Sequence, residues 1–561
     1  MKKFLSGLLS AALAASLLAP SAAAAGTGFT DVPAGSSLAG EVEKAVDCGL
    51  MNGYDAGTFG YGDSMTRAQF VTVLGRMMGW SDGGAHVAMW MIPEAMKVPS
   101  DLSETYLFAI EQAAQRDVVD DDEPFRPSDP ITRGEMAELL VRALGLKGAA
   151  EQVRQLWASR DSAFTAAIPF TDVAGEEAPY IQIAYTIGMT NGTSATTFSP
   201  GSTATRAQAA AMLVRIYEKI TAPTGPVHGF YAISSYSQLD LAGDMDAVSA
   251  GWSRMTWDGE TAVLRTTSAD GNEYAIPSGY EEVTDYLSGR DVPLHLSVFM
   301  EGQELKDLLA SPDDRAQAVE QIVHEVTVDY QTIGENPYSG VTIDFEGLRQ
   351  GQKADFTAFL TALDAELEDL GKELYVCVSP VLAGGTYYDG YDYAAIGRLA
   401  DKVILMAYGY DARDMSGFVG SRYHETAATA PIGQVYLGLA ALTEQVDPDK
   451  VLLGFSAQAT AWQIDGEGDL LSGTPVYPSA ETVAKRLAQP DTEKGWSGAY
   501  QQPYAVYTTE GGGRYFLWYQ DSASVEAAMR AAKLLGVAGA SVWRLGMLPD
   551  SEVWNWDSLL G

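Results

Sequence analysis

The chain of 561 residues is long enough for three or more domains, at roughly 100–200 residues for each. Hydrophobic residues make up 47% of it, which supplies buried cores and excludes a wholly disordered chain. The formal net charge of −38 would repel phosphate backbones, so we expect no nucleic-acid partner, whereas neutral sugars remain compatible ligands. Solubility outside the cell would also explain such a charge.

The first 25 residues have the pattern of a secretory signal peptide. Lys2 and Lys3 precede an apolar run over residues 4–18, and small residues follow at 21–25. A retained membrane anchor is the alternative, but the apolar run is short and no stop-transfer charges follow it, which favours cleavage near Ala25. No later stretch holds the ~20 continuous apolar residues of a membrane span. We therefore expect a secreted protein with no membrane span after signal removal.

Three internal repeats are predicted over residues 27–85, 95–150 and 165–220. The sequence FTDV at residues 29–32 recurs at 170–173, and TRAQ at 66–69 recurs at 205–208. The middle copy lacks the opening motif but keeps TRGE at 132–135. In each copy the threonine predicts a helix N-cap, because it is a good capping residue and a run with helical apolar periodicity follows it.

The arginine after each capping threonine lies in the first helical turn, where its charge opposes the helix dipole. Its recurrence there indicates that the arginines bind an anion; salt bridges between the repeats are the alternative. The repeats resemble S-layer homology domains, a helix-rich class of wall-anchoring unit. The resemblance implies a secondary cell-wall polymer of a Gram-positive-type bacterium as the partner, held at the cell surface by Arg67, Arg133 and Arg206.

Residues 221–227 contain a Pro/Gly cluster and are predicted to link the repeats to a large domain over 228–561. Eight β-rich runs alternate there with helical patterns, which indicates the α/β class and a (β/α)8 barrel (TIM barrel). The segment from about 462 to 519 is too long for a simple crossover and is expected to form an inserted α+β subdomain. The expected strands are Gly229–Ser234, Ser253–Trp257, Leu294–Met300, Val341–Glu346, Leu374–Ser379, Val403–Tyr408, Val451–Phe455 and Ala540–Leu545.

The strand Val341–Glu346 carries a pair of acids. Because successive side chains of a strand point to opposite faces, Thr342, Asp344 and Glu346 share the face opposite the apolar residues. Active sites of such barrels lie at the C-terminal ends of the strands, so both acids would point inward there. Their mutual repulsion raises the pKa of at least one, as a general acid requires. An ion-paired structural cluster is the alternative.

This strand resembles the DxxDxDxE signature of family 18 glycoside hydrolases, although Ser339 and Thr342 replace its first two acids. The resemblance implies substrate-assisted, retaining hydrolysis of β-1,4-glycans that contain N-acetylglucosamine, either peptidoglycan or chitin-like chains. Glu346 would be the proton donor, Asp344 would orient the acetamido group and Tyr408 would bond its oxygen. Trp543 would form the floor under the sugar, and the other expected substrate-binding residues are Tyr231, Met406, Tyr410 and Asp411.

Such hydrolysis needs no cofactor and no metal. The two cysteines, Cys48 and Cys377, fall in different predicted domains, so neither a disulfide framework nor a zinc site is expected. Two other functions stay open: a non-catalytic surface carbohydrate-binding protein on the same barrel, and a purely structural surface-layer protein. A metal-dependent polysaccharide deacetylase would need the histidine-rich ligands that this sequence lacks.

Overall fold

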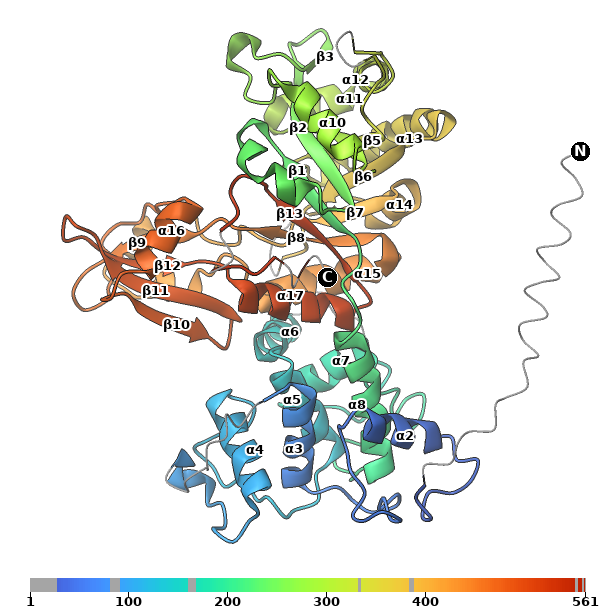
Figure 1. The fold of residues 1–561 in the computed structure, drawn as a ribbon, viewed down its shortest axis with the longest axis vertical. Coiled ribbons are helices and arrows are strands. Elements are labelled where there is room, and N and C mark those ends of the chain that lie inside the picture. Colours follow the sequence, from blue (N-terminus) through green and yellow to red (C-terminus); the bar gives the residue numbers. More distant parts are fainter. Residues whose placement is uncertain are drawn as a thin grey trace, which may run out of the picture.

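The computed structural model describes residues 28–80, 91–159, 168–330, 334–382, 388–549, 553–556 and 559. The predicted signal peptide, residues 1–25, lies outside these ranges. The described chain has two parts, a helical part that contains the repeats and a larger barrel part stacked on it (Figure 1). In these ranges, no helix combines the length and the apolar character that crossing a membrane would need.

The helical part closes the three repeats into a ring. The second helix of each repeat packs on the first helix of the next. The pairs are α3 (Arg67–Met77) with α4 (Glu104–Gln115), α5 (Arg133–Ala143) with α7 (Ala178–Thr186), and α8 (Arg206–Ile220) with α2 (Ala39–Asp47). The predicted N-caps are confirmed, because each capping threonine accepts a hydrogen bond from the backbone N–H three residues later. Ring closure buries the apolar face that an isolated repeat would expose.

Eight parallel strands close into the predicted barrel, in the order β1-β2-β4-β5-β6-β7-β8-β13, with β13 paired back to β1. A short strand, β3 (Ala262–Arg265), pairs antiparallel with the C-terminal end of β2. All eight predicted strands are present, but some of their ends differ from the prediction. The first predicted strand ends at Tyr231, because a 3-10 helix begins at Ile233, and the predicted strand 403–408 ends at Leu405. Strand β2 begins before the predicted Ser253, because a register irregularity between Ala250 and Ser253 interrupts its alternation. The barrel strands are β1 (Val227–Tyr231), β2 (Ala247–Trp257), β4 (Leu294–Met300), β5 (Gly340–Phe345), β6 (Glu373–Val378), β7 (Lys402–Leu405), β8 (Val451–Ser456) and β13 (Gly539–Trp543).

Helices lie around the barrel, and the predicted insertion forms a separate antiparallel sheet in the order β10-β11-β12-β9, which projects to the left in Figure 1. The insertion consists of β9 (Thr460–Ile464), α16 (Ala480–Leu487), β10 (Glu493–Ser497), β11 (Gln502–Thr508) and β12 (Arg514–Trp518). The remaining helices are α6 (Lys147–Ser159), α9 (Leu239–Ala242), α10 (Tyr280–Ser288), α11 (Gly302–Ala310), α12 (Pro312–Glu325), α13 (Lys353–Leu370), α14 (Tyr393–Leu399), α15 (Ile432–Thr443) and α17 (Ser522–Leu534). Short 3-10 helices are η3 (Glu94–Met96), η4 (Ile233–Gln238), η5 (Ala269–Gly271), η6 (Gln350–Gln352), η7 (Ser416–Phe418), η8 (Tyr423–Thr426) and η9 (Pro448–Lys450).

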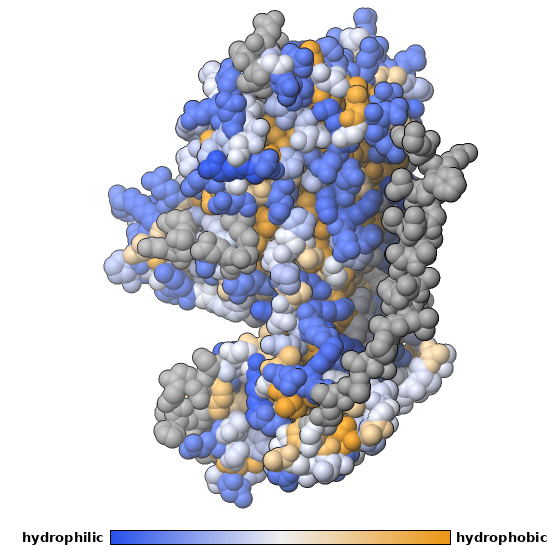
Figure 2. Space-filling model, turned by 45° about the vertical axis from the view of Figure 1, so that its right-hand side comes forward, coloured by the Kyte–Doolittle hydropathy of each residue, from blue (hydrophilic) through white to orange (hydrophobic). Residues whose placement is uncertain are grey.

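The two parts touch directly as well as through the connecting segment. Helix α6 packs on α15, and α8 packs on α17. Lys219 Nζ donates to the carbonyl of Leu534 at 2.8 Å, and the N–H of Gly225 donates to the carbonyl of Ala538 at 2.8 Å. Figure 2 shows hydrophilic residues over much of one face and a hollow between the two parts. These contacts hold the barrel in one orientation relative to the repeats.

Candidate functional site

Strand β5 has the predicted alternation. Phe345 faces outward, with its ring centroid 5.2 Å from that of Phe359 on α13. Thr342 faces inward and shares a 2.6 Å hydrogen bond with Ser249 of β2. Asp344 and Glu346 follow Thr342 at intervals of two residues, so they lie on the inward face at the C-terminal end of the strand.

A chain of hydrogen bonds crosses the barrel below the acids. It joins Ser541 to His228 (2.8 Å), His228 to Ser249 (2.7 Å), Ser249 to Thr342 (2.6 Å), Thr342 to His295 (3.5 Å) and His295 to Glu373 (3.1 Å). Burial lowers the pKa of His228 to about 3, which keeps this imidazole neutral. The inward position two residues before Asp344 is therefore occupied by a neutral, hydrogen-bonded hydroxyl and not by an acid.

The surroundings of Asp344 disfavour the charged form of its carboxyl group. Its side chain is buried, with a residue exposure of 3%. Oδ1 has no hydrogen-bond partner among the described residues, whereas the thiol of Cys377 on β6 donates to the carboxyl group. Burial, followed by the negative charge of Glu346, raises the pKa of Asp344 well above its ordinary value. An unpartnered buried oxygen leaves this carboxyl group free to bond a ligand.

Glu346 lies directly after β5 and is partly exposed at the mouth of the barrel. Its backbone N–H donates to the carbonyl of Met300 at 2.9 Å, which fixes its position beside β4. Burial and the charge of Glu301 raise the pKa of Glu346, and the cation Arg413 partly offsets this shift. A raised pKa favours the protonated form of a carboxyl group, which is the form that a general acid needs.

Tyr408, Met406 and Trp543 lie on the same inward side. The ring of Tyr408 lies against β8, where a Cβ added to Gly454 would come within 2.9 Å of its Cε1. Burial and the charge of Asp344 raise the pKa of Tyr408, so its hydroxyl stays protonated and can donate. Trp543 is partly exposed at the end of β13, with its ring 5.1 Å from that of Phe230. Met406 packs in the same inward cluster as Trp543.

The other predicted sugar-binding residues contact other parts of the chain. Asp411 accepts a 2.8 Å hydrogen bond from Thr460, at the start of the inserted subdomain. The backbone N–H of Tyr410 donates to the carbonyl of Thr429 at 3.0 Å. Tyr231 is buried on the helix-facing side of β1 against Trp252, because His228 and Phe230 take the inward positions of that strand. The structure does not bring Tyr231 together with the acid pair.

Sequence reasoning missed several charged and aromatic residues at the mouth. Glu301 directly follows β4, a position at a strand end that could have identified it. Phe299 pairs in register with Asp344, and Tyr274 stacks on it with centroids 5.1 Å apart and an interplanar angle of 12°. Arg413 and Tyr274 come from loops, where no periodic signal exists. Within the described ranges, no group of three His, Cys, Asp or Glu side chains is placed to hold a metal ion.

The three predicted anion-binding arginines form an equivalent contact in the ring of repeats. The Nε–H of each donates to the carbonyl of a phenylalanine in the next repeat, and the guanidinium lies over that ring. The donor–acceptor distances are 2.7 Å for Arg67 to Phe125, 2.9 Å for Arg133 to Phe198 and 2.9 Å for Arg206 to Phe59. Each guanidinium therefore links neighbouring repeats through a carbonyl group. Within the described residues, Arg67 alone of the three also forms a salt bridge, with Glu135.

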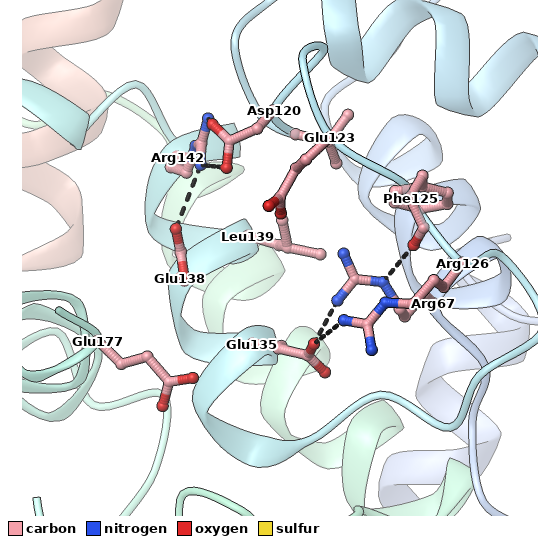
Figure 3. A pocket seen from close by; sticks show the side chains of 11 residues that line it. Arg67, Asp120, Glu123, Phe125, Arg126, Glu135, Glu138, Leu139, Arg142 and Glu177 are labelled. Atoms are coloured by element: carbon pink, nitrogen blue, oxygen red, sulfur yellow. Dashed lines mark hydrogen bonds and ion pairs between the residues drawn. The ribbon is translucent and has the colours of Figure 1, made fainter. Parts of the chain in front are cut away.

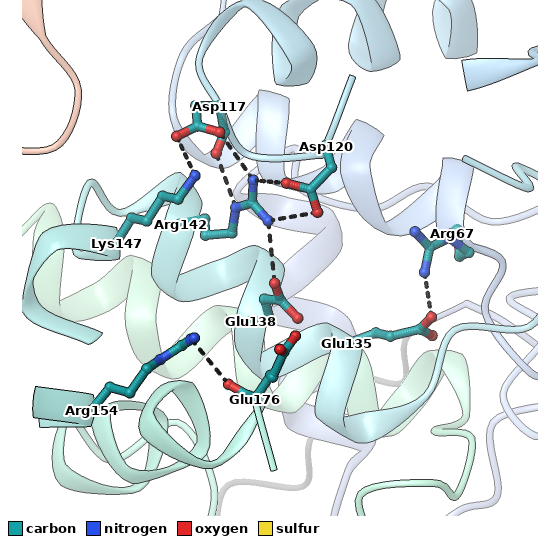
Figure 4. Close-up of polar contacts among 9 residues, drawn as sticks. All are labelled: Arg67, Asp117, Asp120, Glu135, Glu138, Arg142, Lys147, Arg154 and Glu176. Carbon is teal, nitrogen blue, oxygen red and sulfur yellow. Dashed lines mark hydrogen bonds and ion pairs between the residues drawn. The ribbon is translucent and has the colours of Figure 1, made fainter. Parts of the chain in front are cut away.

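The groove beside Arg67 is a pocket of about 170 Å³ in which acids outnumber arginines. Five carboxylates and three arginines line it. Figure 3 shows Arg67 and Arg126 pointing at Glu135 from the same side. Figure 4 shows Arg142 held by Asp117, Asp120 and Glu138. Each arginine of this groove already forms an ion pair with an acid.

The groove beside Arg206 has the opposite character. It is a pocket of about 160 Å³ lined by Arg206 and Arg76, together with polar and apolar residues and no acid. Arg206 is 5% exposed and donates to the carbonyl of Asn52 at 2.8 Å. No carboxylate in the described part of the chain lies within ion-pair distance of either arginine, whereas Arg67 is paired with Glu135. A buried guanidinium without an ion-pair partner favours an anionic ligand.

Two family models match the chain. The model of glycosyl hydrolases family 18 matches residues 257–547, and that of the S-layer homology domain matches residues 28–71, 101–137 and 169–210. The first match contains the acid pair, Tyr408 and Trp543. The second contains the three arginines.

Individual relatives are distant. The cortical fragment-lytic enzyme of Bacillus subtilis (strain 168) is 24% identical over 231 residues, which are 40% of this chain and 50% of the relative. S-layer protein EA1 of Bacillus anthracis is 29% identical over 285 residues, 50% of this chain and 30% of the relative. The chain thus spans about half, or less, of the length of these curated relatives. A solved chitinase from Chromobacterium violaceum superimposes with a TM-score of 0.48 at 20% identity, over 60% of this chain and 97% of that chain.

Proposed function

Because the chain belongs to family 18 of the glycosyl hydrolases and carries three S-layer homology domains, we propose that it is a surface-anchored glycosidase. Its substrate is a β-1,4-glycan that contains N-acetylglucosamine. The observation that carries the proposal is the inward pair of Asp344 and Glu346, both with raised pKa, beside the hydroxyl of Tyr408. A barrel that served only as a scaffold would gain stability from apolar residues at these positions.

In the proposed mechanism, Glu346 donates its proton to the glycosidic oxygen as the bond to the anomeric carbon breaks. The acetamido carbonyl oxygen of the substrate attacks that carbon and forms a cyclic oxazolinium ion. The hydroxyl of Tyr408 orients the carbonyl oxygen. Asp344 accepts a hydrogen bond from the acetamido N–H, and its ionised carboxylate stabilises the positive ion. Water then attacks the anomeric carbon while Glu346 takes its proton, so the configuration is retained. No residue of the site needs a metal or cofactor for these steps.

The repeats are proposed to anchor the enzyme to an acidic polymer in the wall of a Gram-positive-type bacterium. Among Arg67, Arg133 and Arg206, the last has the strongest support, because its groove adds Arg76 and contains no acid. Arg133 is 5% exposed and also lacks a carboxylate partner in the described part of the chain. Arg67 has the weakest support because Glu135 already neutralises it.

The test of catalysis compares the wild type with Glu346→Gln on N-acetylglucosamine oligomers and on purified peptidoglycan. Loss of the general acid should lower turnover by roughly 10²–10⁴-fold. Glu304→Gln is the matched control, because Glu304 is an exposed acid on the neighbouring helix α11 and should leave turnover unchanged. Equal turnover by wild type and Glu346→Gln would overturn the assignment.

A non-catalytic carbohydrate-binding protein is the second candidate. The observation that favours it is the neutral hydroxyl of Thr342 at a signature position where the family has an acid. It predicts that wild type binds both glycans with no products detectable by mass spectrometry.

A further inference from the structure

Three arginines without an ion-pair partner in the described ranges surround the acid pair. They are Arg254, Arg413 and Arg544. Some arginines elsewhere in the chain, such as Arg142, Arg315 and Arg422, are paired with acids, whereas others, such as Arg206 and Arg76, are not paired with any acid among the described residues. The chain has 74 acidic and only 36 basic residues, so a cluster of three arginines at one barrel mouth is a local departure from its overall charge.

Arg254 lies in the same row of the barrel as the acid pair. It pairs in register with Phe299 of β4, which pairs in register with Asp344 of β5. Two strand spacings of about 4.8 Å therefore separate the backbones of Arg254 and Asp344. The guanidinium lies 5.5 Å from the ring centroid of Phe299 and 5.7 Å from that of Tyr274. These two rings hold the cation at the mouth and leave its N–H donors available.

Arg544 and Arg413 come from other strands around the mouth. Arg544 follows Trp543 at the end of β13, where its Nη1 donates to Ser234 Oγ at 2.8 Å. Its guanidinium also interacts electrostatically with Tyr274. Arg413 is exposed in the loop after β7, and its charge acts on Glu346 and Asp411. The acid pair therefore has cations on the β2 and β13 side and on the β7 side.

We propose that Arg254, Arg413 and Arg544 select glycans that carry carboxylates, as N-acetylmuramic acid without an attached peptide does, over neutral chitin-like chains. This inference rests on the proposed glycosidase function. A net charge of −38 and two inward acids would repel an anionic substrate unless local cations offset them. Guanidinium groups bind carboxylates in a two-point geometry that a neutral sugar hydroxyl cannot match.

The experiment measures binding in the Glu346→Gln background, so that hydrolysis does not interfere. The two probes are a tetrasaccharide of alternating N-acetylglucosamine and N-acetylmuramic acid, and the neutral tetramer of N-acetylglucosamine. By calorimetry, we expect the acidic glycan to bind more tightly. Adding Arg413→Gln or Arg544→Gln should weaken its binding about tenfold for each arginine, since a hydrogen bond to a charged group contributes that much. Binding of the neutral tetramer should change less than about twofold.

Arg422→Gln is the matched control, because Arg422 is also exposed in the loop after β7 but is paired with Glu425. It should leave both affinities unchanged. Equal affinity for the two glycans, equal loss for both in the arginine variants, or no binding of either would overturn the inference. Turnover by the wild type is measured separately. Tighter binding of the acidic glycan without turnover contradicts only the glycosidase proposal. Turnover without tighter binding of the acidic glycan contradicts only the inference about the arginines.

Discussion

Replacing Arg133 by methionine should open the ring of repeats. The side chain is 5% exposed and lies over the ring of Phe198 at 4.9 Å. Its Nε donates to the carbonyl of Phe198 at 2.9 Å, and its Nη2 donates to Thr190 Oγ1 at 3.1 Å. Methionine keeps the aliphatic stem but leaves that carbonyl and hydroxyl without their partner.

The expected loss can be estimated from these contacts. Hydrogen bonds from a charged donor contribute about 1.5–3 kcal/mol, a cation over an aromatic ring contributes about 0.5–2 kcal/mol, and relief of the buried charge offsets part of this. We therefore expect a loss of about 3 kcal/mol in the free energy of unfolding. This is a large fraction of the roughly 5–15 kcal/mol that stabilises a domain.

Denaturant unfolding of the full chain, combined with hydrogen exchange of the amides in α5 and α7, measures this loss. Arg126→Met is the control, because the Arg126 side chain is 59% exposed and its loss should change stability by less than about 0.5 kcal/mol. A loss below about 1 kcal/mol in Arg133→Met, or unchanged exchange in α5, would refute the view that this arginine holds the repeats together.

Three further outcomes are expected. Asp344→Asn should abolish turnover yet raise stability at pH 7 by about 1–3 kcal/mol. Burial raises the pKa of Asp344 in the folded state, so the contribution of this residue to stability is full below its unfolded pKa and falls as the pH rises toward its folded pKa. Thermal unfolding should therefore show a smaller gain in stability from Asp344→Asn at pH 4 than at pH 7. An equal gain at both pH values would contradict this. Arg76→Gln should weaken binding of purified acidic wall polymer about tenfold, because Arg76 is exposed in the Arg206 groove; unchanged binding would remove that groove from the proposal. Gly454→Ala should lower turnover and thermal stability together, because its Cβ would lie 2.6 Å from the carbonyl of Leu405 and 2.9 Å from the ring of Tyr408; wild-type turnover would show that the ring need not stay in place.

The acid pair could be predicted because the relevant signal is local. Alternation along Val341–Glu346 is enough to place Asp344 and Glu346 on one face, whatever the rest of the chain does. The N-caps of the repeats were predictable for the same reason, since a threonine and the amide three residues later belong to one turn. The eight strands followed from runs of buried residues that alternate with helical patterns.

The partners of these residues could not be predicted in this way. Tyr231 stands at the end of a correctly expected strand, but the register of β1 turns it toward the helices and puts Phe230 inside. The sequence motif predicted one role for three equivalent arginines, yet only the folded ring shows that Glu135 neutralises Arg67 while Arg206 has no acid beside it.

The sequence by itself determined the repeats, the barrel and the strand that carries the two carboxyl groups, because periodicity and capping depend on neighbours within a few residues. Only the tertiary structure decided which charges meet at the mouth of the barrel and between the repeats. Arg254, Phe299 and Asp344 are separated by 45 residues or more along the chain but stand in one row of adjacent strands. Electrostatic and hydrogen-bond contacts act through space, so their pattern exists only after the ring and the barrel have closed.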